Sequence, residues 1–173
     1  MKIRQAKREQ GLILVFTGNG KGKTTAAVGS AVRMIKHGKR VAMVQFFKAP
    51  SRHMLPHTQF KVWSFGGGFT WQTSRKENLK AARDAWKKCV QLLRDPRYAL
   101  VILDEINIAL KYKFLNIPGV IRTLRRRPKT KHVILTGRGA PKALLKAADL
   151  VTEMRCVKHP FDRGVPAQPG VEF

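Results

Sequence analysis

Residues 12–25, with the sequence LILVFTGNGKGKTT, join a run of apolar residues to a turn rich in glycine and lysine. The apolar part, residues 12–16, predicts a short buried strand. Glycines let the backbone turn tightly, so that successive N–H groups face one concavity, and a helix that begins near Lys23 adds its positive N-terminal end. The stretch therefore predicts a polyphosphate-binding loop, in which Lys23 contacts phosphate and Thr24 binds Mg²⁺. The residues expected to bind the nucleotide here are Gly18, Asn19, Gly20, Lys21, Gly22, Lys23, Thr24 and Thr25.

The loop departs at one position from the common pattern G-x-x-x-x-G-K-[ST]. Thr17 stands where the first glycine is usual, so TGNGKGKT is a variant of that pattern. A glycine-rich turn without any ligand is the competing interpretation. The register of strand, glycines, lysine and threonine favours the phosphate site.

Strand and helix patterns alternate along the rest of the chain. Short apolar runs predict further strands at residues 40–47, 60–65, 98–103, 132–136 and 150–154. Periodicity and composition predict helices at residues 24–37, 74–94, 115–126 and 141–148. This alternation predicts an α/β fold of the P-loop nucleotide-binding type, with a mostly parallel sheet of about six strands, helices on both faces, and ligands at the carboxyl ends of the strands.

Length and composition favour a single domain over residues 11–173, preceded by a basic arm at residues 1–10. The sequence shows neither an apolar run of about 18 residues nor a signal peptide, so we expect a cytoplasmic protein with no membrane segment. Cys89 and Cys156 lack metal-site or redox spacing, and we expect both to be buried, reduced thiols.

The chain is strongly basic, with 35 Lys and Arg against 10 Asp and Glu, a formal net charge of +25. Such a charge attracts any polyanion at low salt and selects none. The densest basic run, RTLRRRPKTK at residues 122–131, has no interleaved aromatic residue. We therefore interpret it as a solvated helix end and loop, and expect nucleic acid to bind only through non-specific charge.

The strand predicted at residues 98–103 is followed by two acids, Asp104 and Glu105, about 80 residues after the glycine loop. Carboxylates at that strand end could hold Mg²⁺ directly or through water, opposite Thr24. In an ordinary ATPase the second acid polarises an attacking water, so spacing alone leaves ATP hydrolysis open. Arg138, after the strand at residues 132–136, is a candidate phosphate contact, and Lys48 is a weaker one.

Three glycines, Gly66, Gly67 and Gly68, precede Phe69 and Trp71. Flexible backbone beside large rings predicts a loop that covers a flat, apolar ligand. The alternative is that these rings only pack beneath the glycines.

Several motifs, read in order, resemble the ATP:corrinoid adenosyltransferases of the phosphate-loop type. They are TGNGKGKTTAA (17–27), VQFFK (44–48), GFTW (68–71), LDEINIAL (103–110), LTGRGAP (135–141), ADLVTEM (148–154) and VKHPFDRGVPAQPGVEF (157–173). The threonine-first loop, GFTW and the tail are specific to that family, whereas a strand ending in Asp-Glu is not. The sequence departs from the family after FTW-x-T, where Ser74-Arg75-Lys76 follows, and in its unusually basic surface.

The resemblance implies a reaction in which ATP is not hydrolysed. A Co(I) corrin attacks the 5′ carbon of the ribose, and triphosphate leaves from a loop that holds the nucleotide reversed relative to ordinary ATPases. It implies catalytic roles for Phe69, Trp71 and Glu105: the two rings lie on the lower face of the corrin and displace the lower axial ligand. It implies Mg²⁺ held by Thr24, Asp104 and Glu105. It also implies a homodimer whose N-terminal segment covers the partner's site, and a reductase, such as a flavoprotein, that supplies the electron.

Overall fold

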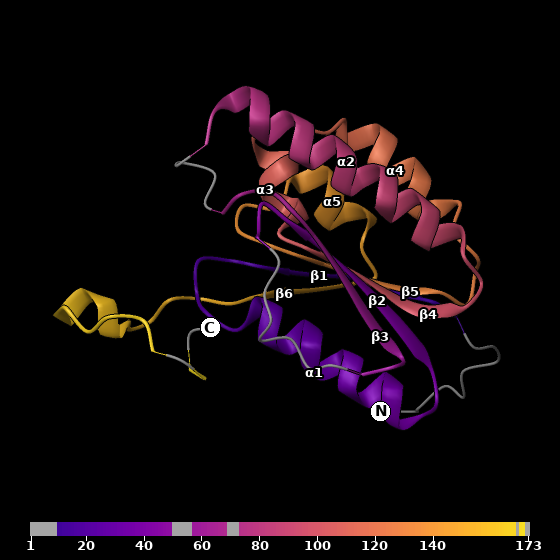
Figure 1. Ribbon diagram of the computed structural model, residues 1–173, viewed down its shortest axis with the longest axis horizontal. Helices are drawn as coiled ribbons and strands as arrows, with labels where there is room; N and C mark the ends of the chain where they lie inside the picture. Colours follow the sequence, from indigo (N-terminus) through magenta and orange to yellow (C-terminus); the bar gives the residue numbers. More distant parts are fainter. Residues whose placement is uncertain (1–9, 50–56, 69–72, 169, 172–173) are drawn as a thin grey trace.

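A computed structural model of the chain describes residues 10–49, 57–68, 73–168 and 170–171. Six strands and five α-helices lie within these residues, and helices separate the strands except between β2 and β3 (Figure 1). The strands are β1 (Ile13–Thr17), β2 (Arg40–Phe46), β3 (Phe60–Phe65), β4 (Tyr98–Asp104), β5 (His132–Thr136) and β6 (Leu150–Glu153). The helices are α1 (Lys23–Lys36), α2 (Arg75–Arg94), α3 (Ile106–Lys111), α4 (Ile117–Arg125) and α5 (Lys142–Ala147), and a 3₁₀ turn, η1, covers Pro160–Arg163.

The strands form one sheet in the order β3-β2-β4-β5-β1-β6, and every neighbouring pair is parallel. Helix α1 covers one face, whereas α2, α3, α4 and α5 lie on the other (Figure 1). The predicted α/β fold, with a six-stranded parallel sheet and helices on both faces, is therefore confirmed. Because all strands run the same way, their carboxyl ends meet at one edge of the sheet and their amino ends at the other.

Each face of the sheet has its own hydrophobic core. The larger core packs α2, α3 and α4 against strand residues such as Val44, Val101 and Leu135, and Trp86 lies partly buried at its margin. The smaller core packs α1 against residues such as Met43 and Ile102. Burial on both faces explains why β2, β4 and β5 read as unbroken apolar runs and not as alternating ones.

Helix α2 has the best-defined beginning of the five helices. The Ser74 hydroxyl accepts the Glu77 N–H, and the Glu77 carboxylate accepts the Ser74 N–H, which makes a capping box. The predicted helix at residues 74–94 is thus confirmed with Ser74 as its N-cap. Helix α3 was not predicted, and the helix predicted over residues 115–126 covers only Ile117–Arg125.

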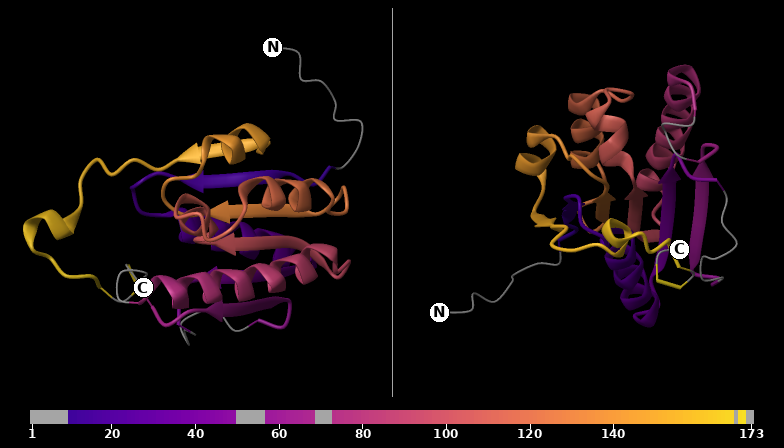
Figure 2. Two further views of the ribbon diagram at one scale, coloured as in Figure 1. Left: turned by 90° about the horizontal axis from the view of Figure 1, so that it is seen from above. Right: turned by 90° about the vertical axis from the view of Figure 1, so that its left-hand side faces the viewer.

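The C-terminal segment after β6 extends away from the sheet on the side of the carboxyl ends of the strands (Figures 1 and 2). Cys156 lies in this segment and is exposed, so its predicted burial is wrong, while Cys89 is buried in the core as predicted. The segment has few elements to pack against, which is why an apolar-looking context did not bury the thiol. No helix in the described part of the chain is long and apolar enough to cross a membrane.

Candidate functional site

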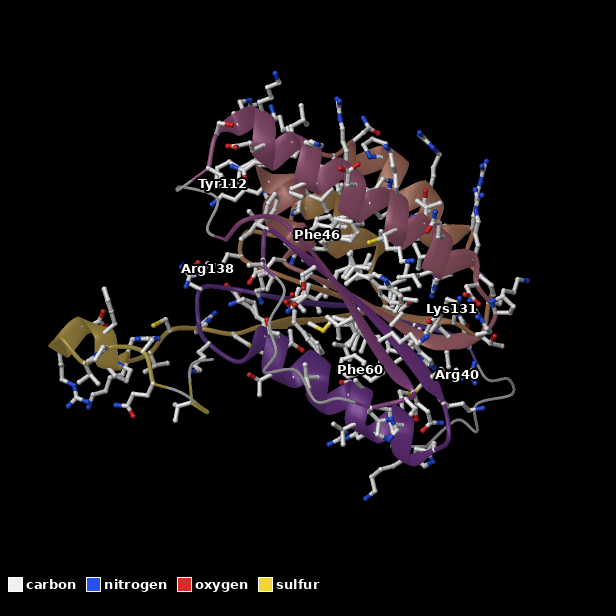
Figure 3. All side chains as sticks on the ribbon, viewed as in Figure 1. Arg40, Phe46, Phe60, Tyr112, Lys131 and Arg138 are labelled. Carbon is white, nitrogen blue, oxygen red and sulfur yellow. The ribbon has the colours of Figure 1, made fainter. Side chains whose placement is uncertain are left out.

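The residues predicted to bind a nucleotide gather at the carboxyl edge of the sheet. The glycine loop follows β1, Asp104 ends β4 and Glu105 follows it, and Gly137 and Arg138 follow β5. Lys48 lies at the same edge, after β2. Figure 3 shows Arg138 at this end of the molecule, far from the labelled residues Arg40 and Lys131 at the other end.

The glycine loop turns sharply into α1. Gly22, the N-cap of α1, has a φ of 107°, a conformation that other residues rarely adopt. Gly20 lies against the backbone of Arg155, where a Cβ would come within 2.5 Å of the Arg155 carbonyl oxygen. The Gly20 N–H donates to the Met154 carbonyl at 2.7 Å. One loop amide that we expected to face phosphate is therefore already used to tie the loop to the end of β6.

Lys23 is a buried lysine, only 7% exposed, within the loop. Its ammonium donates to the Gly20 carbonyl at 2.6 Å. Burial lowers the pKa of Lys23, and the nearby carboxylate of Glu105 opposes that shift. An ammonium has three N–H donors, so one bond to a carbonyl leaves donor capacity for an anion in the loop.

Asp104 is fully buried and is the most heavily bonded side chain of the site. Its Oδ1 accepts the hydroxyls of Thr24 at 2.8 Å and Thr136 at 2.7 Å. Its Oδ2 accepts the Lys48 ammonium at 2.7 Å and the Gln45 amide at 3.3 Å. These bonds satisfy the carboxylate inside the protein, where an unpaired charge would be costly.

Glu105 is held in an unusual backbone conformation, with a φ of 65°, and its N–H donates to the Thr136 hydroxyl at 2.9 Å. Its Oε2 is buried and has no hydrogen-bond partner among the described residues. Burial raises the pKa of the Glu105 carboxyl, and the neighbouring Asp104 adds to the shift. A Cβ on Gly137 would come within 2.9 Å of this oxygen, so glycine at that position leaves room for the carboxylate.

Four other residues predicted to bind the nucleotide have exposed side chains, unlike Lys23 and Asp104. Asn19, Lys21, Thr25 and Arg138 are exposed around the loop, and the Lys21 ammonium donates to the Val171 carbonyl of the C-terminal segment. Arg138 is close enough to lower the pKa of Lys23. Phe69 and Trp71 lie outside the described residues, so their predicted roles stay predictions.

Sequence reasoning did not single out Gln45, Thr136 and Asn107 as site residues. Gln45 bonds to Asp104 and in turn accepts the Ser64 hydroxyl at 3.0 Å. Asn107, fully buried, donates to the Gly137 carbonyl at 2.9 Å. The sequence did contain a signal for these residues, namely a polar residue within an apolar strand or just after one. Buried polar groups need hydrogen-bond partners, so such a residue is a candidate member of a buried network.

The donor set suits a small, hard cation. The Thr24 hydroxyl donates its hydrogen bond to Asp104, so its oxygen lone pairs remain available, and the Glu105 Oε2 has no hydrogen-bond partner among the described residues. Hydroxyl and carboxylate oxygens are the ligands that Mg²⁺ prefers, usually together with phosphate oxygens and water. Among the described residues, no group of three or more His, Cys, Asp or Glu is arranged for a metal.

Comparison with known proteins agrees with this arrangement. Residues 9–173 match the family model described as ATP:corrinoid adenosyltransferase BtuR/CobO/CobP. The chain is 45% identical over 181 residues to a corrinoid adenosyltransferase of Pseudomonas aeruginosa, covering 99% of this chain and 88% of that protein. It is 47% identical over 174 residues to one from Sinorhizobium sp., covering 95% and 81%. It is 44% identical over 179 residues to one from Escherichia coli K12, covering 99% and 90%.

Proposed function

The chain belongs to the ATP:corrinoid adenosyltransferase family, and on that premise we propose that it transfers the 5′-deoxyadenosyl group of ATP to the Co(I) centre of a reduced corrinoid and releases triphosphate. The observation that carries the proposal is the glycine loop and its buried Lys23, placed beside two strand-end carboxylates. A nucleic-acid-associated P-loop ATPase is the alternative, and the names of the relatives do not favour it.

The loop acts on the leaving group. As the bond forms between cobalt and the 5′ carbon, the carbon–oxygen bond to triphosphate breaks and negative charge accumulates on the triphosphate. Lys23, the remaining loop amides and the exposed Lys21 and Arg138 neutralise that charge where it develops. The attacking atom is already a strong nucleophile, so no general base is needed at carbon.

The three oxygen donors Thr24, Asp104 and Glu105 would hold Mg²⁺ at the phosphates, directly or through water. When bound, Mg²⁺ supplies further charge neutralisation on the triphosphate. Asp104 positions the Thr24 hydroxyl by accepting its hydrogen bond at 2.8 Å. Lys48 and Gln45 hold the Asp104 carboxylate from the other side, so the metal ligands stay oriented before the nucleotide arrives.

The direct test is the cobalt product. Incubation with ATP, Mg²⁺ and chemically reduced cobalamin is expected to give the absorption spectrum of the adenosylated corrinoid. A Lys23→Ala variant should lose this product, whereas Lys80→Ala, on the exposed face of α2 and away from the site, should keep it. Absence of cobalt alkylation, together with ATP turnover stimulated by RNA, would support the alternative function instead.

The roles of Phe69 and Trp71 rest on the family motif GFTW at residues 68–71. Two apolar rings beneath the corrin exclude water and deny cobalt its lower ligand, which makes the reduction of Co(II) easier. A Trp71→Ala change should therefore slow the reaction most when cobalt is supplied as Co(II). Rates measured in parallel with prereduced Co(I) provide the control, and an equal effect on both rates would remove the proposed role.

We also propose a homodimer in which residues 1–10, of which 1–9 lie outside the described residues, cover the partner's site, and a flavoprotein-type electron donor. Sedimentation of the full chain and of a chain lacking residues 1–10 tests the dimer. The truncation should lower the rate of cobalt alkylation even where the dimer persists, and an unchanged rate would contradict the proposed covering role.

A further inference from the structure

The amino edge of the sheet carries a second basic hollow, on the side opposite the glycine loop. Its volume is about 520 Å³, and it lies among the turns that lead into β2, β4 and β5. The described residues that line it include four cations and no acid; the charged and titratable members are Lys39, Arg40, Arg97, Lys131 and His132. In Figure 3 the labelled residues Arg40 and Lys131 lie together at this end.

The wall of the hollow is braced by a buried lysine. Lys131 is 2% exposed, and its ammonium donates to the Leu92 carbonyl at 2.9 Å and to the Asp95 carbonyl. These carbonyls belong to the last turn of α2, where a cation is favourable. Lys131 therefore fixes the turn before β5 against the end of α2.

A second cation braces the same turn. The Arg127 guanidinium donates to the carbonyls of Lys131, Leu124 and Gly11, each at 2.7 Å. Pro96 and Pro128 restrict the backbone of the two neighbouring turns. The hollow thus has a preformed wall and does not depend on the exposed side chains for its shape.

The cations available to a ligand are Lys39 and Arg40, on the turn before β2. Both side chains are exposed, and neither has an ion-pair or hydrogen-bond partner among the described residues. Arg97 is different, because it is paired with the Asp95 carboxylate at 2.6 Å. The His132 Nδ1 accepts the Leu12 N–H at 3.2 Å.

We propose that this hollow is a second anion-binding site, separate from the glycine loop, and that it takes a small phosphorylated polyanion of about the size of triphosphate. Adjacent Lys39 and Arg40 would contact the phosphates, Arg40 in bidentate fashion. The volume suits a small ligand. A single-stranded nucleic acid is less well matched, because such sites stack bases on exposed rings, and the aromatic lining residue Tyr98 is 7% exposed with Arg97 over its ring.

Titration calorimetry with inorganic triphosphate tests this site at about 0.15 M salt, where long-range attraction is screened. The unchanged protein should bind two equivalents, and Lys23→Ala should bind one. Adding Lys39→Ala and Arg40→Ala to Lys23→Ala should weaken the remaining site by at least ~10-fold. The control adds Lys80→Ala and Arg83→Ala, which remove the same charge from the exposed face of α2, and should change binding by less than ~2-fold.

Equal weakening by both pairs of substitutions would mean non-specific attraction and would overturn the proposal. So would a single equivalent in the unchanged protein that Lys23→Ala abolishes. An RNA oligonucleotide that binds more tightly as its length grows, and that triphosphate does not displace, would assign the edge to nucleic acid and also overturn it.

Discussion

The two edges of the sheet each contain a buried lysine, and the two lysines have different partners. Lys23, at the carboxyl edge, donates to one carbonyl within a glycine loop and lies near Glu105 and Asp104. Lys131, at the amino edge, donates to two carbonyls that end α2. Burial lowers the pKa of both. Burial of a lysine therefore does not by itself mark a functional site.

The hydrogen-bond partners of the two lysines indicate that Lys23 can bind a ligand, whereas Lys131 stabilises the fold. At Lys131 the acceptors are backbone carbonyls at the end of α2, where carbonyls run out of donors within the helix, so its bonds stabilise the protein. At Lys23 the surroundings include carboxylates and a loop that can hold an anion, so its remaining donors serve binding. Replacing each lysine with methionine, which keeps the length of the stem, should therefore produce opposite effects.

The largest effect is expected for Lys23→Met. Loss of the ammonium removes a charge from the triphosphate in the transition state, and kcat/KM should fall by about 10²–10³-fold. The melting temperature should change little, because Lys23 satisfies only one carbonyl of the fold. The rate of cobalt alkylation and a thermal unfolding curve, measured on one preparation, check both parts. A loss of stability without loss of rate would contradict the assignment of Lys23 to ligand binding.

Asp104→Asn tests whether the carboxyl edge holds a cation. An amide keeps the size of the side chain but loses the negative charge that faces Lys48 and Thr24. The rate should fall by roughly 10²-fold and should need more Mg²⁺ to reach half its maximum. Titration of the rate with Mg²⁺, after chelation, measures this. An Mg²⁺ dependence identical to that of the unchanged protein would exclude Asp104 from the metal site.

Lys131→Met should affect stability and leave the chemistry intact. The carbonyls of Leu92 and Asp95 would lose a charged donor at the end of α2, so the free energy of unfolding should fall by about 2 kcal/mol. That corresponds to a decrease in melting temperature of roughly 4–8 °C. Denaturant and thermal unfolding provide the values, and kcat/KM of the folded protein should stay within about 2-fold. A large loss of rate in Lys131→Met would contradict the claim that this lysine contributes to stability and not to catalysis.

The smallest effect is expected at Asp95, on the amino edge. Hydrogen bonds from the Arg97 side chain and N–H lower the pKa of Asp95 to about 2 from its usual 3.8. A depressed carboxyl pKa stabilises the fold above pH 3.8, and this contribution is lost as the pH falls through about 2. The difference in melting temperature between the protein and Asp95→Asn should thus be small and constant near neutral pH and should vanish toward pH 2. A difference that grows in acid would refute it.

The sequence predicted the carboxyl edge well because local patterns define it. The glycine loop, the strand-end acids and Arg138 each lie where a strand must end, and parallel strands bring those ends together. The bonds around Asp104 of β4 could not be predicted, because they come from α1 (Thr24), from β2 and the turn after it (Gln45 and Lys48) and from β5 (Thr136). Only the strand order brings those elements into contact.

The amino edge was predicted poorly. Lys131 closes the basic run at residues 122–131, which we interpreted as solvated, yet it is buried. Its burial depends on the end of α2, a contact between residues 36 to 39 positions apart that no local pattern records. Arg127, in the same run, likewise bonds to backbone carbonyls. The number of charges along the chain does not distinguish cations that bond to backbone carbonyls, such as Lys131 and Arg127, from the solvated cations around them.

The central claim is that the glycine loop holds triphosphate as a leaving group. Phosphorus NMR of a reaction with ATP, Mg²⁺ and prereduced cobalamin tests this most directly, when it is combined with the absorbance of the adenosylated corrinoid. The account predicts intact triphosphate, formed in equal amount with the cobalt–carbon bond, and no orthophosphate until the triphosphate itself decays. ADP and orthophosphate formed at the rate of ATP loss, with no adenosylated corrinoid, would contradict it.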